Sequence, residues 1–147
     1  MISLSLNDMK DVAKVFVKNE KSGKYLFQLK DDKPDISNPN CYGLLGGNIE
    51  EGESPLEALR RELKEECTVE VFDVEELGNK ILKGVLRGEV CENRFYTFLA
   101  KTRDDINEVA LYEGQKLEYF TIEEALHLDN LSLPAREALN EYRGSLS

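Results

Sequence analysis

The sequence is short of imidazole, thiol and long apolar stretches. Its 147 residues include one histidine, three cysteines and no tryptophan. The single histidine, His127, excludes zinc sites and other metal centres that need two imidazoles. The cysteines are an odd number with no C-x-x-C pair, which predicts no disulfide framework and a reducing, cytoplasmic location. No apolar run approaches the roughly 18 residues that cross a bilayer, so no membrane association is expected.

Positive charge is also scarce. Asp and Glu number 29 against 19 Lys and Arg, which gives a formal net charge of -10. A field of that sign repels DNA and RNA, so binding of a nucleic acid duplex is not expected. The length fits one domain over residues 1–147 that buries its own core without metal or disulfide.

The sequence alternates between strand and helix patterns. A helix is predicted from the capping box Ser54-Pro-Leu-Glu57 to about Glu66, a short one after the capping box Thr121-Ile-Glu-Glu124, and a last one from Pro134 through Tyr142. β-branched and aromatic runs predict strands over residues 12–18, 25–29, 69–74, 81–86, 95–100 and 117–120, and polar loops over residues 31–40 and 101–114. This order predicts an α+β fold, a sheet with helices packed on it.

Glutamates gather on one face of the helix predicted after Ser54. Glu62, Glu65 and Glu66 lie at i, i+3 and i+4, beside the leucine face of the same helix. Such carboxylates repel one another, and the helix dipole disfavours the last two, so stability alone does not account for them. Oxygen ligands converging from one helix suit Mg²⁺, and Arg61 is placed to orient a carboxylate. A solvated acidic face is the alternative interpretation.

The order of residues around this helix resembles the Nudix box, G-x5-E-x7-R-E-U-x-E-E-x-G-U, where U is aliphatic. Residues 47–69 match eight of its nine specified positions, and Thr68 stands where the pattern has its last glycine. Leu44-Leu-Gly46 also resembles the L-P-G-G entry of the family, with Leu45 in place of proline. A glycine at position 68 would serve a left-handed helix cap, so the Thr68 departure is expected to affect the helix end.

The resemblance implies the Nudix fold, an α/β/α sandwich with a mixed sheet, and an enzyme that cleaves a pyrophosphate linkage by water attack on phosphorus. It implies Mg²⁺ as cofactor, with Mn²⁺ as substitute, held by the Gly46 carbonyl, Glu62, Glu65 and Glu66. It also implies support from Gly47 and Glu53, and a catalytic set of Glu65, Glu66, Arg61 and Glu113.

Three further matches point to the MutT-type branch. Glu113-Gly-Gln115 looks like its E-G-Q, which implies that Glu113 joins the metal site or acts as base; a plain loop carboxylate is the alternative. Leu133-Pro-Ala-Arg136 looks like its P-P-A-N with arginine in the last position, so Arg136 is a candidate substrate contact or pairs within its own helix. Lys30 falls where that branch has a basic substrate contact, and an exposed strand-end lysine is the alternative.

Tyr42 is a candidate for stacking on a base, or else an ordinary half-buried strand tyrosine. The leading functional hypothesis is a MutT-like hydrolase that cleaves a nucleoside triphosphate to monophosphate and pyrophosphate. The alternatives are a hydrolase of nucleoside diphosphate sugars or similar conjugates, and a sensor that binds a nucleotide without cleaving it. The expected partner is a small-molecule nucleotide, with the protein a monomer or a homodimer.

Overall fold

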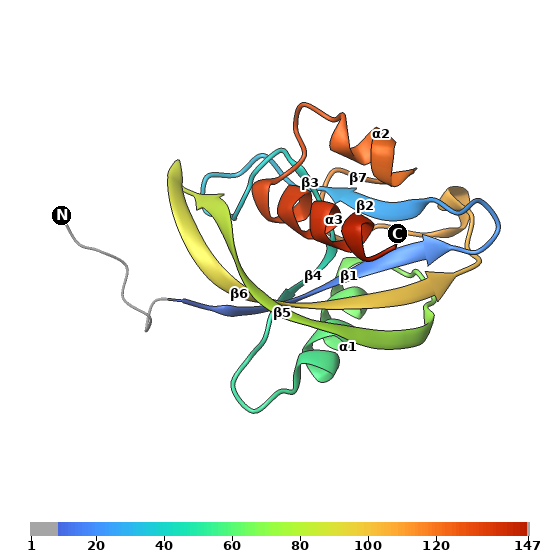
Figure 1. Ribbon diagram of the computed structural model, residues 1–147, viewed down its shortest axis with the longest axis horizontal. Helices are drawn as coiled ribbons and strands as arrows, with labels where there is room; N and C mark the ends of the chain where they lie inside the picture. Colours follow the sequence, from blue (N-terminus) through green and yellow to red (C-terminus); the bar gives the residue numbers. More distant parts are fainter. Residues whose placement is uncertain (1–8, 147) are drawn as a thin grey trace.

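The protein is built around a seven-stranded mixed sheet (Figure 1). The structure is a computed structural model and describes residues 9–146. Strand order is β3-β2-β1-β6-β5, with β4 also paired to β1 and β7 to β2. The elements are β1 (Asp11–Asn19), β2 (Tyr25–Leu29), β3 (Tyr42–Gly43), β4 (Leu45–Asn48), α1 (Pro55–Glu66), β5 (Phe72–Leu86), β6 (Glu89–Thr102), the 3-10 turn η2 (Ile106–Glu108), β7 (Lys116–Phe120), α2 (Ile122–Leu126) and α3 (Leu133–Ser145).

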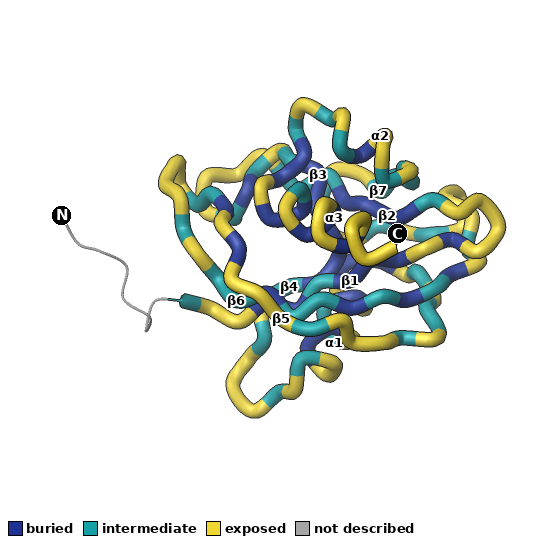
Figure 2. The backbone as a smooth tube through the Cα atoms, in the orientation of Figure 1, coloured by how far each residue is buried: buried dark blue, intermediate teal, exposed yellow. Residues whose placement is uncertain are grey.

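The central strand β1 divides the core in two. It runs parallel to β6 along its whole length and antiparallel to β4 over residues 12–15. Because side chains alternate across a strand, Val12 and Phe16 face one cluster of buried apolar residues, and Val15 and Val17 face the other. Figure 2 shows that buried residues are concentrated in the inner strands β1 and β2, whereas the tip of the β5–β6 hairpin is exposed. Both faces of the sheet are therefore covered.

Each cluster is closed by a helix. Helix α1 contributes Leu59 and Leu63 to one cluster, and α3 contributes Leu139 and Tyr142 to the other, joined by Ala125 of α2. Figure 1 shows α1 on one side of the sheet and α3 with α2 on the other. The prediction of an α+β fold with a mixed sheet between helices is confirmed.

The strands differ from the predictions in length and number. The predicted strands over 69–74 and 81–86 merge into the 15-residue β5, which begins at Phe72 and pairs with β6 as far as Leu86. The polar residues between the two predicted runs belong to the strand because they pair with β6. They lack the regular alternation of apolar and polar residues, so they were not predicted as strand. Strands β3 and β4 were not predicted, because they span two and four residues and consist largely of glycine and leucine.

The end of α1 explains the Thr68 departure. Cys67 leaves the helix in an extended conformation, with φ -167° and ψ -178°, so no left-handed residue ends the helix and no glycine is needed there. Thr68 then joins a short antiparallel contact with the 110–111 segment: its N–H donates to the Ala110 carbonyl at 3.0 Å, and its Oγ1 accepts from the Ala110 N–H at 2.8 Å. The threonine thereby ties the helix end to the loop before β7.

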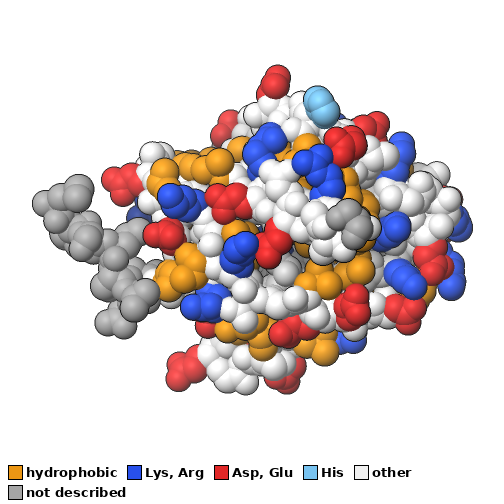
Figure 3. Space-filling view, viewed as in Figure 1, with side chains coloured by type: hydrophobic (Ala, Val, Ile, Leu, Met, Phe, Trp, Pro, Cys, Tyr) orange, Lys and Arg blue, Asp and Glu red, His pale blue; other side chains and the backbone are white. Residues whose placement is uncertain are grey.

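Surface properties bear on the predicted partners. Among residues 9–146, no helix has both the length and the apolar character that crossing a bilayer requires. On the face seen in Figure 3, acidic and basic side chains are interspersed and no continuous basic surface appears. The three cysteines are free thiols.

Candidate active site

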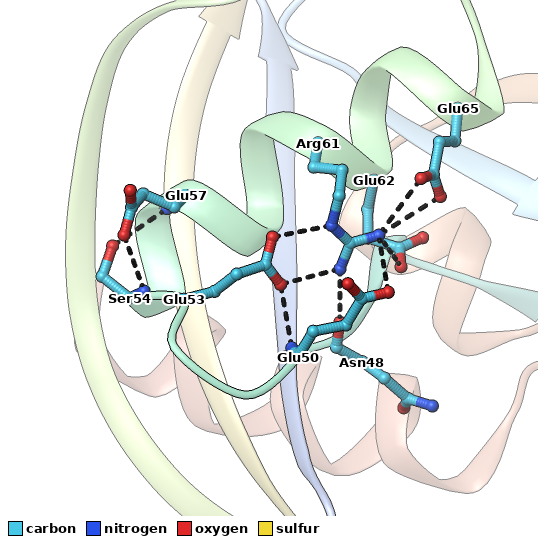
Figure 4. Close-up of polar contacts among 8 residues, drawn as sticks. All are labelled: Asn48, Glu50, Glu53, Ser54, Glu57, Arg61, Glu62 and Glu65. Atoms are coloured by element: carbon cyan, nitrogen blue, oxygen red, sulfur yellow. Dashed lines mark hydrogen bonds and ion pairs between the residues drawn. The ribbon is translucent and has the colours of Figure 1, made fainter.

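Arg61 lies at the centre of a carboxylate cluster on α1 (Figure 4). Its Nε and Nη2 donate to the two oxygens of Glu53 at 2.7 and 2.9 Å. Its Nη1 donates to Glu62 at 3.0 Å and to Glu65 at 3.2 Å, and Nη2 also donates to the Asn48 carbonyl at 2.9 Å. A planar guanidinium suits this task because its donors are fixed in one plane. The predicted pair of Glu53 and Arg61 is brought together, with Glu62 and Glu65 attached.

The charged groups of this cluster shift one another's pKa values. The hydrogen bond from Arg61 holds the pKa of the Glu53 carboxyl below its usual range, and the surrounding carboxylates raise the pKa of Arg61. Burial raises the pKa of Glu62, and the hydrogen bond from Arg61 opposes that rise. Arg61 thus keeps the Glu53 carboxylate ionised and partly offsets the effect of burial on Glu62.

The Glu66 side chain does not contact Arg61 and is buried inside the protein. It is 4% exposed, and its Oε1 accepts the Gly46 N–H at 2.8 Å. Burial raises the pKa of Glu66 to about 7, against the opposing effect of the Lys14 charge. The last carboxylate of the cluster is therefore fixed against the glycine strand β4.

Two consecutive glycines let β4 approach its neighbours closely. Gly46 has φ +127°, and a Cβ there would overlap the Ala13 carbonyl of β1. A Cβ on Gly47 would overlap the carboxylate of Glu62. Gly46 is thus needed for the strand pairing, and Gly47 makes the space in which the Glu62 carboxylate lies.

The loop that carries Glu113 docks on the end of α1. The Tyr112 and Glu113 N–H groups donate to the Glu66 carbonyl at 2.7 and 3.2 Å, and Gln28 Nε2 donates to the Glu113 carbonyl at 2.8 Å. Glu113 lines the same cavity as Glu62 and Glu66. The structure therefore brings the E-G-Q segment to the glutamate helix.

Lys14 is a site residue that the sequence reasoning missed. Its Nζ donates to the Gly46 carbonyl at 2.9 Å and to the Leu44 carbonyl at 3.3 Å. Burial lowers the pKa of Lys14, while Glu66, Glu62 and Glu113 raise it. The available signal was a lysine in the middle of an otherwise apolar strand, at a position that alternation assigns to the core.

These residues line one end of a cavity of about 400 Å³. Gly46, Glu62, Glu66 and Glu113 line it together with Lys14 and Lys30. Its remaining walls come mainly from β1, the 31–38 loop, the β5–β6 hairpin and the 132–138 segment, and they mix apolar side chains such as Val12 and Phe95 with polar ones such as Asn93 and Thr97. A group of carboxylates and cations therefore opens into a space of mixed polar and apolar character.

The donor set suits a hard divalent cation, although the acids do not form a closed cage. Glu62, Glu66, Glu113 and the Gly46 carbonyl offer the oxygen ligands that Mg²⁺ prefers, and the space left by Gly47 holds one of these carboxylates. Among the described residues 9–146, however, no three Asp, Glu, His or Cys side chains converge closely enough to hold a metal ion. The reason is local: Arg61 draws Glu62 and Glu65 toward itself, while Glu66 bonds to Gly46.

The candidate substrate contacts have different outcomes. Lys30 lines the cavity, and burial together with the like charge of Lys14 lowers its pKa to about 8. Tyr42 and Arg136 lie outside it. The Tyr42 hydroxyl donates to Glu118 at 2.8 Å, and its ring packs edge-on against Phe120. Arg136 donates to the carbonyls that end α2, Leu126 at 2.8 Å and Leu128 at 3.1 Å. Both side chains therefore have partners within the protein, and those of Arg136 lie around the end of α2, not within its own helix as the alternative had predicted.

Comparison with known families identifies the fold. A family model described as "NUDIX domain" matches residues 9–142. The chain belongs to the NUDIX domain family. The identification of a Nudix hydrolase from residues 47–69 is thereby confirmed. The glutamate helix of this Nudix hydrolase is α1, and its glycine entry is β4.

Solved structures share the Nudix fold at low sequence identity. A MutT protein from Methanosarcina mazei has a TM-score of 0.75 and 21% identity over 95% of this chain and 96% of its own. The NUDIX domain of Shewanella oneidensis NrtR, complexed with ADP ribose, has a TM-score of 0.74 and 16% identity over 95% and 89%. The E. coli dihydroneopterin triphosphate pyrophosphohydrolase has a TM-score of 0.69 and 17% identity over 91% and 96%. A comparison with curated protein sequences gives no match.

Proposed function

We propose that this Nudix hydrolase is a magnesium-dependent pyrophosphohydrolase that cleaves a nucleoside triphosphate to a monophosphate and pyrophosphate. The observation that carries the proposal is one cavity, in which glutamates and lysines share a space with both apolar and polar wall residues. A nucleotide has the same combination, because its phosphates are anionic and its base has apolar faces and polar edges. Apolar side chains combined with polar groups that fix the orientation of a ligand are typical of small-molecule sites.

The side chains that would hold Mg²⁺ are those of Glu62, Glu66 and Glu113, with Glu65 beside them. The Gly46 carbonyl, which the family resemblance adds to this set, is bound by Lys14 Nζ. Mn²⁺ would take the same oxygen ligands. When bound, the ion offsets the charge of the phosphates and makes the phosphorus more open to attack. Glu62 already lines the cavity, whereas Glu65 hydrogen-bonds to Arg61 and would have to turn toward the cavity to reach the ion.

The protein side chains have separate tasks in the reaction. Glu66, with its buried carboxyl, and Glu113, on the docked loop, are the candidates to accept the proton of the attacking water. As the water oxygen bonds to phosphorus, the phosphoanhydride bond breaks and pyrophosphate leaves. Lys30 lines the cavity as a cation for the phosphates, and Arg61 positions the carboxylates without touching substrate.

The similar structures support this class of chemistry without choosing among substrates. They include a triphosphate pyrophosphohydrolase, a MutT protein and a domain complexed with ADP ribose. A nucleoside diphosphate conjugate such as ADP ribose is therefore the second candidate substrate, and it shares the pyrophosphate linkage.

A substrate panel in Mg²⁺ tests the proposal. Nucleoside triphosphates and nucleoside diphosphate sugars are incubated separately, and the products are resolved by ion-exchange chromatography. Release of pyrophosphate from a triphosphate supports the proposal, whereas release of a sugar phosphate supports the second candidate. Tight nucleotide binding with no product after long incubation would identify a sensor.

A matched pair of variants ties activity to the site. Glu66→Gln is expected to lower kcat at least about a hundredfold, because a single general base or metal ligand has an effect of that order. Glu137→Gln changes an exposed carboxylate on α3 and is expected to retain wild-type kcat. Equal turnover by Glu66→Gln and wild type would refute the assignment of the site.

A further inference from the structure

We propose that the Lys14 ammonium is a resident cation of the active site. It hydrogen-bonds to the Gly46 carbonyl and takes the place of one divalent ion at that oxygen. This inference rests on the proposed metal-dependent function. It changes the expectation for Gly46, since the carbonyl that the family resemblance assigns to a metal ion is bound by a side chain of the protein itself.

Strand pairing fixes the position of Lys14. Lys14 and Gly46 are directly opposite each other in the antiparallel β1–β4 pair, between the pairs Ala13–Gly47 and Val15–Leu45. From there the ammonium reaches the Gly46 carbonyl at 2.9 Å and the Leu44 carbonyl at 3.3 Å. Two backbone acceptors, one in β4 and one directly before it, hold the charge in one place, unlike a surface lysine, which samples many rotamers.

The charge of Lys14 acts on the carboxylates that line the cavity. Its electrostatic partners are Glu62, Glu66 and Glu113, the same three acids that would hold Mg²⁺. A buried ammonium is costly unless opposite charges compensate it, and these acids offset part of that cost. A divalent ion on the Gly46 carbonyl would lie only a few ångströms from the ammonium and would be strongly repelled. Lys14 and a metal ion therefore exclude each other at this oxygen.

A second observation agrees with this arrangement. Although α1 carries three glutamates in five positions and Glu113 is nearby, no three acidic, histidine or cysteine side chains converge on one point within residues 9–146. The acids are instead spread around two internal cations, with Glu62 and Glu65 on Arg61 and Glu66 within the field of Lys14. The site has its own positive charges in addition to any ion that it binds.

A crystal structure of the wild-type protein with Mn²⁺ tests the inference without a substitution. The anomalous difference map shows where each ion lies. We expect Mn²⁺ on the glutamate carboxylates, with Lys14 Nζ still within hydrogen-bond distance of the Gly46 carbonyl. An ion on the Gly46 carbonyl, with Lys14 displaced, would overturn the inference while leaving the proposed function intact.

Calorimetric titration with Mn²⁺ gives a second readout. Lys14→Met keeps the length of the side chain and removes its charge, and is expected either to bind one additional ion per chain or to bind Mn²⁺ at least about tenfold more tightly than wild type. Lys18→Met, four residues along the same strand at an exposed position, serves as the control, with an affinity within about twofold of wild type. Unchanged stoichiometry and affinity in Lys14→Met would contradict the resident-cation role.

The outcomes separate this inference from the proposed function. If Lys14→Met does not fold, the wild-type crystal structure still decides the matter. If neither protein binds Mn²⁺, the metal-dependent function and the inference fail together, because Lys14 would then replace nothing. If wild type binds Mn²⁺ and cleaves nucleotides while its Gly46 carbonyl binds an ion, only the inference fails.

Discussion

A single guanidinium, that of Arg61, holds three glutamates and a backbone carbonyl in one arrangement. Lysine carries the same charge but lacks the planar fork that contacts both oxygens of Glu53. We therefore expect Arg61→Lys to lower kcat/KM by about a hundredfold or more. Measurement at saturating Mg²⁺ checks this, with Arg60→Lys, an exposed neighbour, as the control. Near-wild-type activity in Arg61→Lys would show that the fork is dispensable.

Glu66 predicts how stability depends on pH in the absence of metal. Burial raises its pKa from 4.5 to about 7, so the folded state binds this proton more tightly than the unfolded state. Protonated Glu66 therefore makes its full contribution to the free energy of unfolding below about pH 4.5. This contribution, on the order of 3 kcal/mol, is lost as the pH rises through about 7. Chemical unfolding in EDTA across this range measures it.

Glu66→Gln is the companion variant for that measurement. A glutamine oxygen can still accept the Gly46 N–H but does not ionise. Its free energy of unfolding should show a shallower fall between pH 4.5 and 7 than that of wild type. Parallel curves for the two proteins would mean that Glu66 does not titrate with the raised pKa.

Sequence reasoning could predict that residues at fixed intervals along one loop and helix lie close together. Glu53, Arg61 and Glu62 have this spacing, and hydrogen bonds join them in the structure. Their roles in catalysis stay predictions. Lys14 could not be placed in the site, because it depends on which strand pairs with β4 and in which register. Arg136 has a partner only once the turn after α2 folds back on α3.

At the scale of the element, the two glycines of β4 have different tasks. We expect Gly47→Ala to leave the fold intact and to lower kcat at least about tenfold, because its methyl group would displace the Glu62 carboxylate. Gly46→Ala should lower the free energy of unfolding by about 2 kcal/mol or more, since a β carbon at φ +127° overlaps the β1 backbone. Thermal unfolding and kinetics of both variants check this division. Equal thermal stability of the two variants would contradict it.

The helix end depends on the Thr68 hydroxyl, which accepts the Ala110 N–H at 2.8 Å. Thr68→Val keeps the shape and removes the acceptor, so we expect a loss of about 1 kcal/mol and faster hydrogen exchange at the Ala110 amide. Thr68→Ser keeps the hydroxyl and should retain slow exchange. The idea fails if the valine and serine variants exchange this amide equally fast.

At the scale of the whole molecule, the cavity depends on contacts between distant segments of the chain, and those of Asn38 are among them. Asn38 donates its N–H to the Val85 carbonyl at 2.6 Å and accepts the Val85 N–H on Oδ1 at 2.8 Å, joining the 31–40 loop to the β5–β6 hairpin. We expect Asn38→Ala to raise KM several-fold with little change in kcat, because the walls loosen while the glutamates stay in place.

Steady-state kinetics on the best substrate of the panel measure this effect. Asn79→Ala breaks a hydrogen bond to Arg94 on an exposed part of the same hairpin and should leave KM unchanged. A fall in kcat at constant KM in Asn38→Ala would instead connect this contact to the chemical step.

The packing of helices on a sheet could be predicted from the sequence, whereas the cavity could not. Capping boxes at Ser54 and Thr121 and the alternation in β1 were sufficient to predict helices on a sheet, because they are local. The cavity walls come from the 31–38 loop, the β5–β6 hairpin and α3, whose approach depends on long-range pairing such as Asn38 with Val85. Composition carries no signal for such pairing.

The division of the cavity between chain segments has a consequence for how specificity can change. The glutamates come from residues 46–66 and Glu113, whereas many of the other wall residues, Asp31 and Asp35 included, come from 31–38, 84–97 and 132–138. Substitutions or insertions in the latter segments can reshape the space for the base while the bond-breaking residues keep their positions. The protein is thus suited to directed evolution toward new nucleotides, in which libraries confined to those three segments alter substrate preference and preserve turnover.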